Sequence, residues 1–170
     1  MNPGKGGAFP GDLALRPVKA EDWGFLLELY SSTRCAEMAL SGWNDEQKRL
    51  LIESQFDAQR RHYEYAYVGA EHLVVLAEGE RIGRYYVQRQ PEKIHIIDIS
   101  LMPQWRNRGI GSKMLGQILT EAALTGKKVS LNVERFNPAL NLYRRLGFQV
   151  ADESDKIRLY MERLPAAILK

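Results

Sequence analysis

The stretch IHIIDISLMPQWRNRGIGS, residues 94–112, decides the fold. Its first part, 94–101, is rich in β-branched residues and predicts a strand. The loop after it leads into a predicted helix over 109–124, which Gly126 closes. Alternating apolar and polar residues at 129–133 predict the next strand. A strand, a helix and a second strand in this order predict a right-handed βαβ unit with parallel strands.

Shorter elements precede this unit. Turn-rich connections predict an antiparallel meander of strands at 72–77, 81–88 and 94–101. Before the meander the sequence predicts a strand at 13–17 and helices at 20–30 and 45–62, the second capped by Asn44. The fold class is therefore mixed α/β, with a central, largely antiparallel sheet and one parallel crossover.

The last part of the chain contains a short helix with distinct boundary signals. Asn137 is the predicted N-cap, Pro138 the first helical residue, and Gly147 lies just past the end. A closing hairpin of strands at 148–150 and 157–163 follows, in which we expect Ile157, Leu159 and Met161 to share one face.

Length and composition limit the class of protein. The 170 residues, 45% of them hydrophobic and 26% charged, fit one folded domain at 13–170 after a loose tail at 1–12. The single cysteine, Cys35, excludes an intramolecular disulfide and multi-cysteine metal sites. No apolar run approaches the ~18 residues that span a bilayer, and the tail does not resemble a secretory signal. We expect a cytoplasmic protein that does not associate with membranes.

Charge and histidine patterns disfavour two further classes. The net charge of +3 is mild and the basic residues are scattered, so we do not expect a nucleic-acid partner. His62, His72 and His95 lack metal-ligand spacing, so no metal is implied. We expect His62 and His72 at the surface or at strand edges, and Cys35 as a buried or loop thiol.

The segment 106–112 predicts an anion site. It joins a strand to a helix N-terminus, where backbone N–H groups and the helix dipole attract anions such as a diphosphate. Gly109 and Gly111 let the backbone approach closely, Arg106 and Arg108 add charge, and Asn107 tolerates a left-handed conformation. The spacing fits neither a Walker A loop nor a dinucleotide fingerprint, because Arg106 and Met114 stand where those motifs need glycine.

Two motifs resemble signatures of the GCN5-related N-acetyltransferase (GNAT) family. The sequence Arg106-x-x-Gly109-x-Gly111 is similar to its R/Q-x-x-G-x-G/A acyl-CoA signature. The segment 137–148, NPALNLYRRLGF, is similar to N-x-x-A-x-x-L-Y-x-x-x-G-F, with the alanine one place early. The order of elements from Leu13 onward also suits the family, so the resemblance covers nearly the whole chain beyond the tail.

The resemblance implies acetyl-CoA as the cofactor. The parallel strands ending near Leu101 and Val133 would splay apart, so that main-chain groups could pair with the pantetheine arm. Asn137 would contact that arm unless it serves only as a helix cap. The implied cofactor-binding residues are Leu101, Met102, Pro103, Arg106, Asn107, Arg108, Gly109, Ile110, Gly111, Ser112 and Asn137.

The resemblance also points to Tyr143 as the proton donor to the departing thiolate. The proton acceptor for the amine stays open between His95, Asp98 and an ordered water. Period-two alternation places His95 and Asp98 on opposite faces of their strand. Among the aromatic residues, Tyr30, Trp43, Tyr85 and Tyr86 could line an acceptor pocket, although core packing is the more common role for such residues.

The function implied is transfer of an acetyl group from acetyl-CoA to an amine by direct attack in a ternary complex. The alternatives are a non-catalytic acyl-CoA binding or sensing module and a weak nucleic-acid binder. The acceptor amine, carried by a small molecule or a protein, is not specified by the sequence. We expect the helical region 31–67 to determine it, and a homodimer is implied by analogy alone.

Overall fold

The computed structural model describes residues 13–166. The strands are β1 (Leu13–Pro17), β2 (Glu71–Ala77), β3 (Glu80–Arg89), β4 (Lys93–Leu101), β5 (Lys128–Glu134), β6 (Gln149–Asp152) and β7 (Arg158–Arg163). The α-helices are α1 (Trp23–Ala39), α2 (Asp45–Ala66), α3 (Ile110–Thr125) and α4 (Leu140–Arg145). Short 3-10 turns at Ala20–Asp22 and Pro103–Trp105 precede α1 and follow β4.

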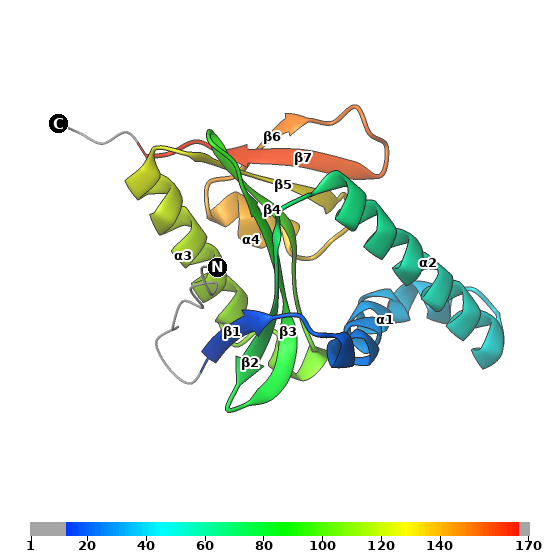
Figure 1. The fold of residues 1–170 in the computed structure, drawn as a ribbon. Coiled ribbons are helices and arrows are strands. Elements are labelled where there is room, and N and C mark those ends of the chain that lie inside the picture. The colour runs from blue at the N-terminus through cyan, green and yellow to red at the C-terminus, as the bar shows by residue number, and fades with distance from the viewer. Residues whose placement is uncertain (1–12, 167–170) are drawn as a thin grey trace. The chain divides into compact units, whose positions relative to one another are not determined.

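The strands form a seven-stranded sheet in the order β1-β2-β3-β4-β5-β7-β6 (Figure 1). The β4–β5 pair is parallel, with α3 as the crossover helix between them. The pairs β1–β2, β5–β7 and β6–β7 are antiparallel. This arrangement confirms the predicted fold class, a mixed α/β fold with one parallel crossover.

The described chain divides into two compact units. The first contains residues up to Tyr85 together with Ser100–Arg106, and the second contains Tyr86–Ile99 and the residues from Asn107 onward. The expectation of one domain at 13–170 stays a prediction, and the expected tail at 1–12 lies outside the described residues.

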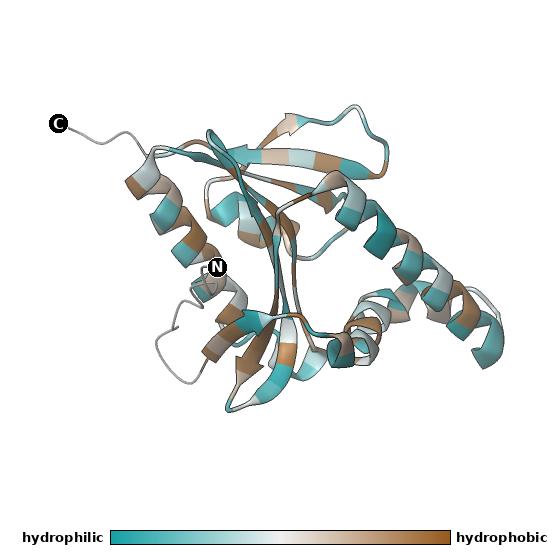
Figure 2. Ribbon diagram, viewed as in Figure 1, coloured by the Kyte–Doolittle hydropathy of each residue, from teal (hydrophilic) through white to brown (hydrophobic). Residues whose placement is uncertain are grey.

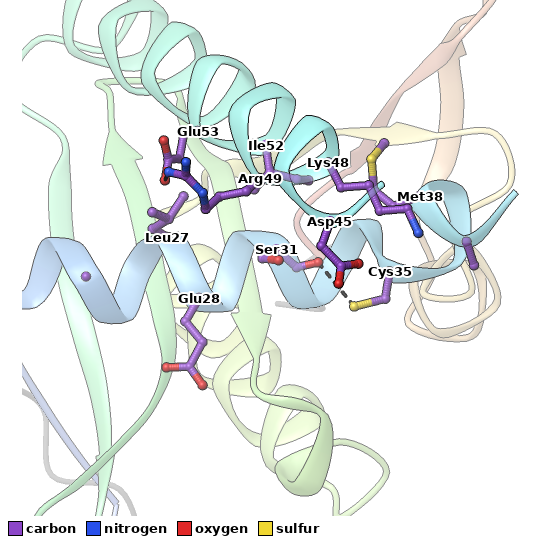
Figure 3. Close-up of a pocket in the computed structure, with 12 residues that line it drawn as sticks. Leu27, Glu28, Ser31, Cys35, Met38, Asp45, Lys48, Arg49, Ile52 and Glu53 are labelled. Carbon is purple, nitrogen blue, oxygen red and sulfur yellow. Dashed lines mark hydrogen bonds and ion pairs between the residues drawn. The ribbon is translucent and has the colours of Figure 1, made fainter. Parts of the chain in front are cut away.

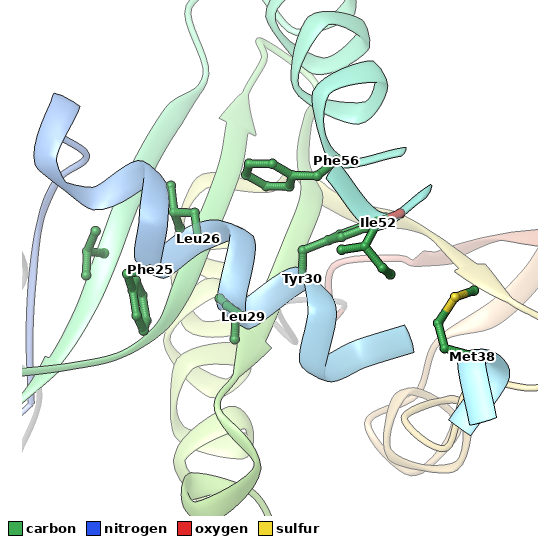
Figure 4. Packing of buried hydrophobic residues seen from close by; sticks show 8 residues of the cluster. Phe25, Leu26, Leu29, Tyr30, Met38, Ile52 and Phe56 are labelled. Atoms are coloured by element: carbon green, nitrogen blue, oxygen red, sulfur yellow. The ribbon is translucent and has the colours of Figure 1, made fainter. Parts of the chain in front are cut away.

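Helices α1 and α2 build the core of the first unit (Figure 4). Helix α2 is mostly hydrophilic, with short hydrophobic bands (Figure 2). Its buried residues, Ile52 and Phe56, pack in one cluster with α1. The ring of Phe56 lies 5.6 Å from that of Tyr30, and Val74 of β2 joins the cluster. A narrow apolar stripe is therefore enough to hold the long polar helix.

The fully buried carboxylate of Asp22 fixes the start of α1. Arg16 of β1 donates two hydrogen bonds to it, at 2.7 and 2.8 Å, and the Lys19 backbone N–H donates a third at 2.8 Å. Arg81 of β3 adds a contact at 3.3 Å. The bond from Arg16 is the main cause that holds the pKa of Asp22 well below its usual range.

In the second unit α3 packs on β5. The helix buries the apolar stripe that the sequence predicts, Ile110, Met114, Leu115, Ile118, Leu119 and Ala122. Gly126, at φ 67°, ends the helix as its C-cap. On β5 the alternate residues Val129, Leu131 and Val133 are buried as well.

Several local predictions were wrong. Helix α4 begins at Leu140 rather than Pro138, because the Leu140 N–H donates to the Asn137 carbonyl at 3.0 Å in a three-residue turn that precedes the α-helix. The Asn137 side chain accepts from the Ala139 N–H at 2.9 Å within that turn. Ile157 lies outside β7 and is 68% exposed, so it does not share the buried face of Leu159 and Met161. Cys35 is exposed on α1 rather than buried or in a loop.

Helices α1 and α2 also extend beyond the ranges predicted for them, to Ala39 and Ala66. His72, the second residue of β2, is half-buried, and the Arg84 Nε donates to its Nε2 at 3.0 Å. Within residues 13–166, no helix is both long and apolar enough to cross a membrane. The same residues contain no cluster of three or more His, Cys, Asp or Glu suited to a metal ion.

Candidate active site

The parallel pair of β4 and β5 opens partway along its length. Its register runs from Lys93↔Lys128 to Ile96↔Leu131. Both strands continue past this point, β4 to Leu101 and β5 to Glu134. Beyond Leu131, β5 keeps its pairing with β7, since Asn132 pairs with Tyr160 and Glu134 with Arg158. The two parallel strands therefore separate at their carboxyl ends, as the family resemblance implies.

The loop before α3 has the backbone geometry of an anion site. Asn107 and Gly109 are both left-handed, with φ of 59° and 80°, and Gly109 is the N-cap of α3. No side chain caps the helix, and its first turn contains no acidic residue. A Cβ placed on Gly111 would meet open space. With Arg108 exposed beside it, this 16-residue helix presents an uncapped N-terminus that fits a diphosphate.

Arg106, the first residue of the signature, makes two contacts within the first unit. Its Nε donates to the Leu101 carbonyl at 2.8 Å and its Nη2 donates to Ser32 Oγ at 3.1 Å. The Met102 N–H donates to the Ile82 carbonyl at 2.8 Å. Main-chain groups of Leu101 and Met102 are thus already hydrogen-bonded inside the protein. Pro103 begins the 3-10 turn that follows.

Gly83 of β3 sets the path of the end of β4. A Cβ at this position would press against the Ser100 carbonyl oxygen and would lie 2.7 Å from Leu101 Cδ2. Only glycine allows the two backbones to approach so closely. The sequence analysis did not identify this residue, although an isolated glycine within a predicted strand is a signal of close backbone approach.

Tyr143 of α4 is held by the turn that ends its helix. Its carbonyl accepts from the Phe148 N–H at 3.0 Å, and the two rings meet edge to face with centroids 5.8 Å apart. Gly147, left-handed at φ 88°, makes this turn possible. Burial, with a smaller effect from the charge of Asp98, raises the pKa of Tyr143 to about 12. The phenol therefore keeps its proton at neutral pH.

The two proton-acceptor candidates have different surroundings. Asp98 is half-buried, lies two residues beyond the end of the parallel register, and its charge acts on Tyr143. His95 lies within the register, opposite Ser130, and is only 5% exposed. The structure therefore associates Asp98 with Tyr143 and places His95 in the closed part of the strand pair.

His95 is surrounded by β5 and β7. Its Nδ1 and Ser130 Oγ share a hydrogen bond of 2.8 Å, and its ring stacks on that of Tyr160 at 6.5 Å and 24°. Burial and, to a smaller extent, the charge of Lys93 lower the pKa of His95 to about 4. The imidazole is neutral at pH 7 but a weak base.

A groove of about 560 Å³ lies between α1 and α2 in the first unit (Figure 3). Its apolar lining includes Leu27, Met38 and Ile52. Its charged lining comprises the carboxylates of Glu28, Asp45 and Glu53 and the cations Lys48 and Arg49. Several of its residues fall within the region 31–67, where we expected acceptor recognition. Of the aromatic candidates, Tyr30, Tyr85 and Tyr86 are buried, whereas Trp43 is 45% exposed.

A sequence comparison identifies the family. The model described as Acetyltransferase (GNAT) family matches residues 26–148. The chain belongs to this family, whose members are acetyl-CoA-dependent N-acetyltransferases. The protein is thus an enzyme of that class, and acetyl-CoA is its cofactor. A search of curated proteins found no significant match.

Solved structures share the fold at low sequence identity. The PaiA N-acetyltransferase of Thermoplasma acidophilum, solved with coenzyme A, is 19% identical with a TM-score of 0.66, over 89% of this chain and 98% of that one. An acetyltransferase of Thermus thermophilus is 18% identical, with a TM-score of 0.63 over 92% and 99%. Naa50 of Arabidopsis thaliana, solved with the bisubstrate analogue CoA-Ac-MVNAL, is 15% identical, with a TM-score of 0.58 over 89% and 98%.

Proposed function

We propose that the protein transfers the acetyl group of acetyl-CoA directly to an acceptor amine in a ternary complex, with Tyr143 and Asp98 as the proton-transfer pair. The observation that carries this proposal is their position in the second unit. Asp98 lies on β4 just past the end of the parallel register, and its charge acts on the phenol of Tyr143. The proposed proton donor and proton acceptor thus belong to the same unit, and the acceptor lies where the strands separate.

The cofactor is held mainly through main chain in this proposal. The N–H groups at the start of α3, with Arg108, bind the diphosphate through charge and the helix dipole. The pantetheine arm lies along 97–99 of β4 and 132–134 of β5, where the register no longer joins the strands. Contacts to Leu101, Met102, Pro103 and Asn137 stay predictions, as two of the main-chain groups at 101–102 are already bonded.

Two residues move protons in the proposed reaction. When bound, acetyl-CoA supplies a thioester, whose C–S bond breaks as a C–N bond forms to the acceptor amine. Tyr143 Oη keeps its proton at neutral pH, because burial raises its pKa to about 12, and it is the group that gives a proton to the leaving sulfur in this proposal. The Asp98 carboxylate accepts the proton that the amine nitrogen releases. We assign His95 no proton transfer, since it is buried in the closed part of the strand pair, where its Nδ1 shares a hydrogen bond with Ser130 Oγ.

The acceptor is an amine held by the first unit in this proposal. The groove between α1 and α2 combines apolar walls with three carboxylates, Glu28, Asp45 and Glu53, and two cations, Lys48 and Arg49. Arg49 is paired with Glu53, and the remaining groups leave a small excess of negative charge for an amine on an apolar body. Peptide and small-molecule amines both meet this description. An acceptor screen should therefore include N-terminal peptides and free alkyl amines.

Titration calorimetry with acetyl-CoA tests the cofactor, with NAD and ATP as controls. We expect one-site binding of acetyl-CoA alone. Thiol release with a panel of amines then tests turnover. Tyr143→Phe should lower the rate about 100-fold while leaving the acetyl-CoA Kd within about threefold, because the phenol acts on the leaving group. Asp98→Asn should lower the rate and His95→Gln should not; the reverse result would reassign the proton acceptor.

A further inference from the structure

We propose that Arg106 is a positioning residue that ties helix α1 to the end of β4 through Ser32, and that its side chain does not bind the phosphates of the cofactor. The inference rests on the proposed cofactor site, which begins at the next residue, Asn107. The three residues involved, Ser32, Leu101 and Arg106, all lie in the first unit.

The hydrogen bonds of Ser32 give the tie a defined direction. The Ser32 hydroxyl donates to the Leu29 carbonyl of its own helix at 2.6 Å. Its oxygen is thereby oriented as an acceptor, and Arg106 Nη2 donates to it at 3.1 Å. The Ser32 hydroxyl therefore links α1 to Arg106, which lies 74 positions further along the chain.

The Nε of the same guanidinium holds the loop between Leu101 and Arg106. Arg106 Nε donates to the carbonyl of Leu101, the last residue of β4, at 2.8 Å. Between them the Trp105 and Arg106 N–H groups donate to the Met102 and Pro103 carbonyls, at 2.9 and 3.2 Å. The planar, fork-shaped guanidinium thus bonds to β4 and to α1 at the same time.

The tie has a consequence for acceptor recognition. Helix α1 forms one wall of the groove, and Ser31, adjacent to Ser32, lines it. A change at the cofactor loop that moves Arg106 is therefore transmitted to the helix that lines the groove. We expect coenzyme A to order α1 as well as its own binding loop.

Amide hydrogen exchange with coenzyme A as the probe tests this coupling. In the unaltered protein, saturating coenzyme A should slow exchange in α1. In Ser32→Ala the slowing should fall by about 3- to 10-fold, the range expected for loss of one hydrogen bond, while the coenzyme A Kd changes less than about threefold. Ser32→Thr keeps the acceptor oxygen and should restore the effect.

Thr33→Ala is the matched control. The Thr33 hydroxyl makes the same kind of bond, to the Tyr30 carbonyl at 2.7 Å, without contacting Arg106. Equal loss of protection in Ser32→Ala and Thr33→Ala would overturn the proposal, because the effect would then belong to the helix alone. Absence of coenzyme A binding in the unaltered protein would instead refute the proposed cofactor site.

The Arg106→Gln variant tests the alternative role of the guanidinium. If Arg106 positions α1, the double variant with Ser32→Ala should lose no more protection than Arg106→Gln alone. The Kd and its salt dependence should stay close to those of the unaltered protein. A Kd raised more than about tenfold together with a weaker salt dependence would assign the guanidinium to the phosphates and overturn the proposal.

Discussion

His95 and Ser130 face each other across the parallel strands, with Nδ1 and Oγ 2.8 Å apart. The hydroxyl is fully buried and the imidazole nearly so. A hydroxyl can accept or donate this bond, so it suits a neutral imidazole. The pair therefore joins β4 to β5 just before the register ends.

Stability should decrease in mild acid because of this histidine and His72. Their folded-state pKa values, about 4 and about 3, lie below the ordinary histidine value of 6.5. Below pH 6.5 these two histidines bind protons in the unfolded chain but stay neutral in the folded protein, so the free energy of unfolding falls. Each histidine contributes up to about 1.4 kcal/mol per pH unit in that window. Urea unfolding from about pH 8 to about pH 4 measures this, and a flat curve across mild acid would contradict it.

Gly109 and Gly111 should respond differently to alanine. Gly109 has φ 80°, so Gly109→Ala should cost about 1 kcal/mol of stability. At Gly111 in the first turn of α3 a Cβ meets no atom, so Gly111→Ala should keep or raise the unfolding temperature. Gly111→Ala should also leave acetyl-CoA binding nearly unchanged, because the family signature accepts alanine at this position, whereas Gly109→Ala should weaken it by disturbing the left-handed backbone at the N-cap of α3. Thermal unfolding and calorimetric titration of both variants measure the two effects, and a larger loss of affinity in Gly111→Ala than in Gly109→Ala would contradict this prediction.

Gly83→Ala should destabilise the fold by about 1–3 kcal/mol, because its methyl group would displace Ser100 and Leu101. Gly116→Ala is the control, since a Cβ there meets no atom within 4 Å. Denaturant unfolding should show a loss for the first variant and none for the second. If Gly83→Ala were as stable as the unaltered protein, β3 and β4 would be able to move apart without loss of folding free energy.

Asp22→Asn should cost about 2–3 kcal/mol, because the neutral amide cannot match the charged bonds from Arg16 and Arg81. The pKa of Asp22 is lowered in the folded protein, so its contribution is complete above the ordinary value of 3.8 and decreases as the pH falls further. The stability difference between the two proteins should therefore shrink in strong acid. A difference that stays constant from neutral pH to about pH 2 would argue against a charge effect.

Local sequence patterns predicted most of the helices and strands, but they did not predict contacts between residues far apart in the chain. The buried stripe of α3 follows from its helical period of about 3.6 residues, and the left-handed Asn107 from its place in the loop. The predicted start of α4 was wrong because the chain after Asn137 first forms a three-residue turn, closed by the bond from the Leu140 N–H to the Asn137 carbonyl. No local signal relates Ser32 to Arg106, 74 residues apart, or fixes where the parallel register stops.

The opening between β4 and β5 bears on how such a protein can diverge. The register ends after Ile96↔Leu131, so the peptide groups of β4 and β5 are not joined to each other beyond this pair. A ligand that pairs with peptide groups imposes little selection on the side chains around it. Structures that share 19% or 18% identity with this chain keep its fold over most of their length. The backbone geometry of the fold can therefore be kept while most of the sequence changes.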